Sequence, residues 1–224
     1  MTKYMLISPQ KLNILNCILL FTLTGIAGIA YAEHTIYILN LPHINEWEQK
    51  VFSSKTKYDV VEINGKHCLK ATSKASASGL VRNIDIDLKK TPYLKWTWKV
   101  ENILKDVDET QKSGDDYPAR VYVVISGGLF FWNTRAISYN WTSSEPKGSI
   151  WPNAYTDNAV MVSVQSGAEQ VGQWVSEKRN VLDDVKNLLG IDATEINAVA
   201  IMTDTDNSKQ SAIAYYGNIM FSEE

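Results

Sequence analysis

The chain has 224 residues and a formal net charge of −3 at pH 7. A mildly acidic chain argues against a nucleic-acid-binding protein, because such proteins need clustered lysine and arginine. Its two cysteines, Cys17 and Cys68, are too few for a disulfide-stabilised fold, so the fold must be held together by an apolar core.

Residues 1–32 have the features of an export signal. Lys3 and Lys11 give a positively charged start, a long apolar stretch follows, and Ala32 ends a small-x-small motif. We expect cleavage after Ala32, a periplasmic or secreted protein, and a single β-sandwich domain over residues 33–224. The alternative is a membrane anchor through an uncleaved signal, but polar residues and glycines interrupt the apolar stretch.

The rest of the chain consists of short apolar or alternating runs separated by turns. Residues 58–73 contain two such runs around Asn64-Gly65, the strongest short signal for a β-hairpin. In residues 93–102, Trp96 and Trp98 alternate with polar side chains, and we expect both rings to lie in the core. Strands of this length and spacing predict an all-β fold, a jelly-roll β-sandwich.

The sequence also predicts one short amphipathic helix. Apolar residues recur at helical spacing between Val181 and Leu189. Asn180 is suited to the N-cap position, and Gly190 can end the helix. We expect its apolar face to pack on one end or face of the sandwich.

Two tryptophans are candidates for ligand contact. Trp132 and Trp151 lie in loop-like stretches where no strand period would bury them. Exposed aromatic side chains usually pack on another part of the protein or contact a ligand. Both outcomes are open for these two residues.

Two aspartates and an arginine stand at the start of a nearly continuous apolar strand. Asp115 and Asp116 can simply shape the turn, or one of them can pair with Arg120. The third alternative makes Asp115 or Asp116 a general acid, a general base or a metal ligand. Strand alternation places Arg120 and Tyr122 on one face, which indicates a polar surface or groove and makes both candidates for ligand binding.

A second acidic segment offers oxygen atoms at alternating positions, a pattern suited to a hard cation such as Ca²⁺. Asp204, Asp206 and Asn207 are the candidate ligands, although Lys209 replaces the glycine of an EF-hand loop. Asp, Asn and Ser are also common turn residues, and a hairpin loop between two strands is the favoured interpretation.

Glu177 and Arg179 precede the predicted helix, as a candidate acid or base and a candidate anion ligand. The sequence has no zinc-binding pattern, no nucleophile elbow, no P-loop and no dinucleotide fingerprint. These absences favour a protein that is not an enzyme.

Four motifs occur in a recognisable order: W-x-W at Trp96, G-D-D-x-x-A-R from Gly114, W-x-x-E-x-R-N from Trp174, and D-T-D-N from Asp204. Together they resemble the DUF3047 family of exported bacterial proteins, over residues 47–221. The resemblance supplies no catalytic residues. The last strand is similar to that of galactose-binding-like jelly rolls, many of which are carbohydrate-binding modules with a structural calcium.

The resemblance implies that the polar residues of these motifs form one cluster: Asp115, Asp116, Arg120, Glu177, Arg179, Asp204 and Asp206. The leading hypothesis is an exported, non-catalytic β-sandwich that binds a polysaccharide or another cell-envelope component. One alternative is a carboxylate-based cell-envelope hydrolase or lyase. Another is an envelope assembly or scaffold protein.

Overall fold

A computed structural model describes residues 34–39, 41–128 and 133–224. The export signal predicted for residues 1–32 and the Trp132 candidate therefore lie outside the described residues. Within them, no helix is both long enough and apolar enough to cross a membrane.

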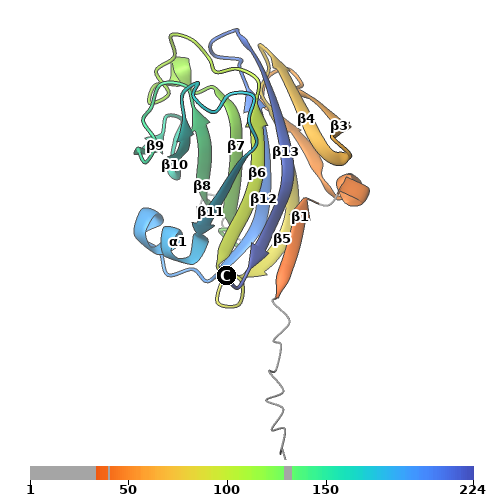
Figure 1. Cartoon of the computed structure of the whole chain (residues 1–224). Helices are drawn as coiled ribbons and strands as arrows, with labels where there is room; N and C mark the ends of the chain where they lie inside the picture. Colours follow the sequence, from red (N-terminus) through yellow and green to blue (C-terminus); the bar gives the residue numbers. More distant parts are fainter. Residues whose placement is uncertain (1–33, 40, 129–132) are drawn as a thin grey trace, which may run out of the picture. The chain divides into compact units, whose positions relative to one another are not determined.

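The described residues form two β-sheets (Figure 1). The six-stranded sheet has the order β11-β6-β13-β4-β3, and β1 pairs with the far end of β13. All its pairs are antiparallel. Its strands are β1 (Thr35–Leu39), β3 (Lys57–Ile63), β4 (Lys66–Lys74), β6 (Tyr93–Val100), β11 (Val175–Asn180) and β13 (Ser211–Ser222).

The seven-stranded sheet has the order β2-β5-β12-β7-β8-β10-β9. Its pairs are antiparallel except for β8 and β10, which run parallel. Its strands are β2 (Glu48–Val51), β5 (Ser78–Asp87), β7 (Tyr117–Ile125), β8 (Arg135–Thr142), β9 (Ile150–Asn153), β10 (Thr156–Ser166) and β12 (Glu195–Asp204). The prediction of an all-β jelly-roll sandwich with one short helix is confirmed.

Aromatic side chains join the two sheets in the core. Trp96 and Trp98 on β6 are fully buried, as their alternation predicts, and contact each other edge to face at 5.4 Å. Across the sandwich, Trp96 lies 5.5 Å from Tyr139, and Trp98 lies 5.9 Å from Trp141. Such tilted ring pairs contribute about 0.5–1.5 kcal/mol each beyond the area they bury.

The predicted hairpin is present between β3 and β4. Asn64 has φ 51° and Gly65 has φ 75°, so both turn residues adopt the left-handed conformation that matches the twist of the strands. The pairing of Ile63 with Lys66 closes the two-residue loop.

The helix α1 (Val181–Leu189) also follows the prediction. The Asn180 side chain accepts a hydrogen bond from the Asp183 amide, and Gly190 ends the helix with φ 65°. Two short 3₁₀ helices, η1 (Leu41–Glu46) and η2 (Lys112–Gly114), lie in connections.

A buried carboxylate fastens α1 to the sandwich. Asp184 accepts two hydrogen bonds from Arg179 on β11, at 2.9 and 2.6 Å, and one from the Tyr139 hydroxyl on β8 at 2.8 Å. Burial and the charge of Asp184 raise the pKa of Tyr139, so its hydroxyl remains a donor. Asp184 therefore links the helix to both sheets.

One connection differs from the prediction. The segment after Asp204 was expected to be a hairpin loop, but β12 and β13 belong to different sheets, so the hairpin prediction is wrong. The loop instead crosses the end of the sandwich, where the Thr205 amide donates to the carbonyl of Ser76 at 2.9 Å.

The substitution Asp184→Ala should lower the free energy of unfolding by about 2–4 kcal/mol, because it leaves a buried hydroxyl and a guanidinium without their acceptor. Urea denaturation followed by tryptophan fluorescence measures this change. Lys186→Ala, at an exposed position of the same helix, is the control and should change stability by less than about 0.5 kcal/mol. Equal effects of the two substitutions would show that Asp184 does not anchor the helix.

Candidate functional site

Arg120 is the centre of a polar cluster on the outer face of the seven-stranded sheet. Its side chain is only 3% exposed, and its Nε donates to Asp204 Oδ1 at 2.9 Å, while Nη2 donates to Asp204 Oδ2. Nη1 donates to the Tyr122 hydroxyl at 2.8 Å, and Nη2 also donates to the Asp115 carbonyl at 2.7 Å. The guanidinium lies 3.9 Å from the centre of the Tyr117 ring.

These contacts keep Arg120 charged. Burial lowers the pKa of Arg120, but its interactions with Asp204, Tyr122, Asp115 and Tyr117 together outweigh burial, and the net shift is upward. The Asp115 carboxylate adds a second ion pair at 3.6 Å. Arg120 therefore pairs chiefly with Asp204, which lies 84 positions further along the chain, and only weakly with the neighbouring aspartate.

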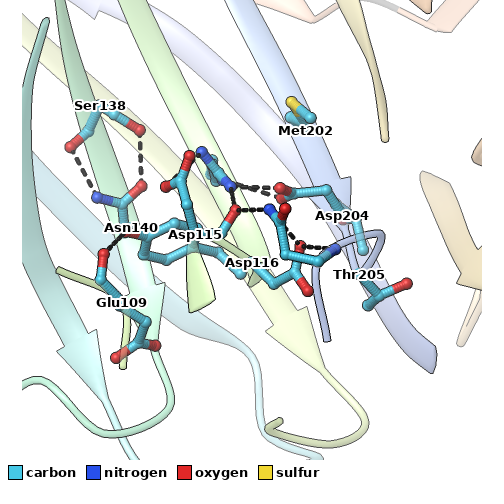
Figure 2. Close-up of polar contacts among 12 residues, drawn as sticks. Glu109, Asp115, Asp116, Ser138, Asn140, Met202, Asp204 and Thr205 are labelled. Carbon is cyan, nitrogen blue, oxygen red and sulfur yellow. Dashed lines mark hydrogen bonds and ion pairs between the residues drawn. The ribbon is translucent and has the colours of Figure 1, made fainter. Parts of the chain in front are cut away.

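Asp116 holds the turn before β7 against the loop after β12 (Figure 2). Its carboxylate accepts from the Asn207 amide at 3.2 Å and the Ser208 amide at 2.5 Å. The Asn207 side chain also donates to the Asp115 carbonyl at 3.3 Å. Gly114 permits this turn, since a Cβ there would lie 2.3 Å from the carbonyl oxygen of Asp108. The two acidic motifs thus form one rigid unit.

A pocket of about 440 Å³ opens beside this unit. Its wall comes from β7, β9, β10 and β12, from the loops next to them, and from the connections after β2 and before β5. The residues that line it are Phe52, Ala77, Asp115, Arg120, Tyr122, Asn153, Tyr155, Thr156, Ala159, Met202, Asp204, Asp206 and Asn207.

Two exposed aromatic side chains belong to this lining, and the sequence analysis missed both. Phe52 follows β2 and is 73% exposed, whereas Tyr155, between β9 and β10, is 56% exposed. The Tyr155 hydroxyl donates to Asn207 Oδ1 at 3.1 Å, which fixes the ring beside the polar cluster. Both residues lie in short connections outside the strands, so their sequence context resembles that of the loop tryptophans and could have identified them.

The structure thus brings most of the predicted site residues to one place. Of the candidates on described residues, seven belong to the Arg120 cluster or the pocket: Asp115, Asp116, Arg120, Tyr122, Asp204, Asp206 and Asn207.

Glu177 and Arg179 do not join them, so the expectation of one polar cluster needs correction. Both residues are on β11, at the edge of the six-stranded sheet, and Arg179 is bound to Asp184. Glu177 lies opposite Trp96 in the register, and burial raises the pKa of its carboxyl group. The motifs separate because β11 and β7 belong to different sheets.

Trp151 is also placed away from the pocket lining. Its ring is 8% exposed and stacks on Tyr117 at 6.5 Å, and its Nε1 donates to the carbonyl of Glu109 at 3.2 Å. The Tyr117 hydroxyl donates to the same carbonyl at 3.0 Å. Of the two outcomes open for Trp151, the structure therefore shows packing.

The acidic residues of the unit lie close enough to share a cation. Carboxylate oxygens of Asp116, Asp204 and Asp206 all lie within 4.8 Å of one another. A hard cation such as Ca²⁺ would have to share Asp204 with the Arg120 guanidinium. The side-chain oxygen of Asn207 already accepts a hydrogen bond from the Tyr155 hydroxyl. Burial and the charge of Asp116 raise the pKa of Asp206.

Several solved structures are similar to this chain at low sequence identity. The xyloglucanase domain of NopAA, a type three effector from Sinorhizobium fredii in complex with cellobiose, is 10% identical with a TM-score of 0.47, covering 79% of this chain and 92% of that chain. Endoglucanase cel12A from Rhodothermus marinus is 11% identical with a TM-score of 0.44, covering 84% and 99%.

The family 30 carbohydrate-binding module of a cellulosomal cellulase of Clostridium thermocellum is 12% identical with a TM-score of 0.40, covering 86% of this chain and 91% of that chain. A search of the curated proteins finds no match. The model of the family described as "Protein of unknown function (DUF3047)" matches residues 45–220. This match spans most of the chain and agrees with the order of the motifs, and the chain therefore belongs to the DUF3047 family.

Proposed function

We propose that this protein is an exported, non-catalytic β-sandwich that binds a neutral glycan in the pocket beside Arg120. The observation that carries this proposal is the pairing of two exposed aromatic rings, Phe52 and Tyr155, with a rigid polar floor in one pocket. An aromatic ring offers an apolar face to the C–H groups of a sugar, and the polar floor offers partners for its hydroxyl groups.

The charge of the lining favours a neutral ligand. Among the residues that line the pocket, Asp115, Asp204 and Asp206 oppose the single guanidinium of Arg120. An acidic polymer would be repelled by this excess of carboxylates. Sugar hydroxyl groups, in contrast, can donate hydrogen bonds to carboxylate and amide oxygens without bringing a charge.

Binding fits the cluster better than catalysis because most of its carboxylates are already engaged. Asp204 accepts two hydrogen bonds from Arg120, and Asp116 accepts hydrogen bonds from two backbone amides. Glu177 and Arg179, which the hydrolase alternative requires in the same cleft, lie on β11 in the other sheet, where Arg179 is bound to Asp184. One observation still favours that alternative, since a carboxyl group with a raised pKa, such as Asp206, is suited to general-acid chemistry.

Phe52→Ala and Tyr155→Ala should each weaken the binding of a soluble neutral glucan by about tenfold or more, because aromatic anchors carry much of the energy of such contacts. Isothermal titration calorimetry with laminarin and hydroxyethylcellulose measures this loss. Tyr37→Ala removes an equally exposed ring, 56%, that does not line the pocket, and should leave binding unchanged.

Two results would contradict this proposal. The first is a failure of the unaltered protein to bind any neutral glucan or other neutral polysaccharide tested. The second is that the protein releases reducing ends from a polysaccharide and that Asp206→Asn abolishes this release. That result would favour the hydrolase.

The exported part of the proposal has its own test. Expression of the full chain in a bacterium should give a mature protein in the periplasm or medium whose first residue is Glu33, as N-terminal sequencing would show. The basis is the positively charged start, apolar stretch and small-x-small motif that end at Ala32. A protein that stays in the cytoplasm with its first residues intact would refute the proposal of export. It would not affect the proposal of glycan binding in the pocket.

A further inference from the structure

The outer face of the six-stranded sheet is strongly basic although the chain as a whole is acidic. Strand alternation directs seven lysines outward. Each lysine either alternates with core-facing residues on its own strand or lies in register with an outward-facing residue of the next strand. We call this set the basic face: Lys57, Lys66, Lys70, Lys74, Lys95, Lys99 and Lys178.

These lysines outnumber the acidic side chains that alternation places on the same face, where Asp59 lies in register with Lys70. Among the described residues, Lys57 pairs with Asp59 at 2.8 Å, and Lys99 pairs with Glu101 at 2.7 Å. Lys178 lies in direct register with Lys95 on the neighbouring strand. Lys178 Nζ also lies 4.2 Å from the centre of the Tyr93 ring, so a cation–π contact holds this side chain along the sheet.

Aromatic rings lie among the lysines. Lys99 Nζ is 4.5 Å and Lys70 Nζ is 5.9 Å from the centre of the Tyr215 ring, which lies between them in the register. Trp174 is 42% exposed and lies 6.4 Å from Tyr215. Gly217 gives this ring its place over the sheet, because a Cβ there would lie 3.4 Å from Trp174 and 2.3 Å from a side-chain oxygen of β6.

A hollow of about 380 Å³ opens next to Trp174. Lys66 and His67 line it from β4, Asn218 from the adjacent β13, and Thr97 from β6 beyond β13. The hollow thus combines one exposed indole face, one lysine at its edge and several hydrogen-bonding groups. A sugar ring that carries an acidic group matches this combination, since the indole can stack on the ring and the ammonium can pair with the acid.

We propose that the basic face is a second binding surface, whose ligand is an acidic polysaccharide with carboxylate groups along its chain. Lysines on four of the sheet's strands extend beyond the Trp174 hollow, so successive acidic groups of one polymer can be bound across the sheet. This surface shares no residue with the pocket beside Arg120 and does not depend on a ligand there.

The test uses the full mature chain with polygalacturonate as the acidic probe and dextran as the neutral probe, in affinity electrophoresis at low salt. We expect retention by polygalacturonate alone, and a loss of about tenfold or more in 0.5 M NaCl, where screening shortens the range of charge interactions to a few ångströms. The variant Lys66→Glu with Lys74→Glu should bind at least about tenfold more weakly.

The matched control is Lys89→Glu with Lys186→Glu, which changes the net charge equally at two exposed lysines away from the basic face. This control should bind polygalacturonate as tightly as the unaltered protein does. Phe52→Ala should do the same, because Phe52 lines the pocket beside Arg120 and not the Trp174 hollow. Trp174→Ala should weaken binding without changing the net charge, which separates a built site from general attraction. Circular dichroism melting confirms that each variant is folded.

Three results would overturn this inference. One is the absence of polygalacturonate binding by the unaltered protein at low salt. Another is that the variant Lys66→Glu with Lys74→Glu loses no binding, or loses no more than the control Lys89→Glu with Lys186→Glu. The third is tighter binding of anionic lipid vesicles or of single-stranded DNA than of polygalacturonate, which would assign the basic face to a different class of partner.

Discussion

The ion pair between Arg120 and Asp204 is the constraint on which the proposed glycan site depends. It joins β7 to β12 at the centre of the seven-stranded sheet, where both side chains are nearly free of solvent. Removal of one partner from a buried pair typically costs about 3–5 kcal/mol, because the remaining charge has no partner. The same guanidinium holds the Asp115 carbonyl and the Tyr122 hydroxyl, so the floor of the pocket is fixed before any ligand arrives.

The sandwich gives its two outer faces opposite chemistry. The seven-stranded sheet carries a pocket whose lining has more carboxylates than cations, and the six-stranded sheet carries seven lysines. The aromatic core between them, built around Trp96 and Trp98, separates the two sets of charges. The two proposed binding surfaces therefore lie on opposite faces of the sandwich and share no residue.

Local features were predictable from the sequence, and features that depend on strand pairing were not. The Asn64-Gly65 turn and the caps of α1 follow from the conformational preferences of single residues. The crossing loop after Asp204 could not be predicted, because a turn sequence does not tell which sheet the next strand joins. Nor could the basic face, because its lysines are spread over more than a hundred residues and only the register of β3, β4, β6 and β11 gathers them.

An NMR titration of ¹⁵N-labelled mature protein with a neutral glucan oligosaccharide tests the central claim most directly. The account predicts that the largest chemical-shift changes fall on the amides of Phe52, Tyr155 and Asn207, around the pocket, while the amides near Trp174 on the opposite sheet stay unchanged. Saturable shifts confined to the Trp174 side, or no saturable shifts with any neutral oligosaccharide, would contradict the assignment of the pocket beside Arg120 as the glycan site.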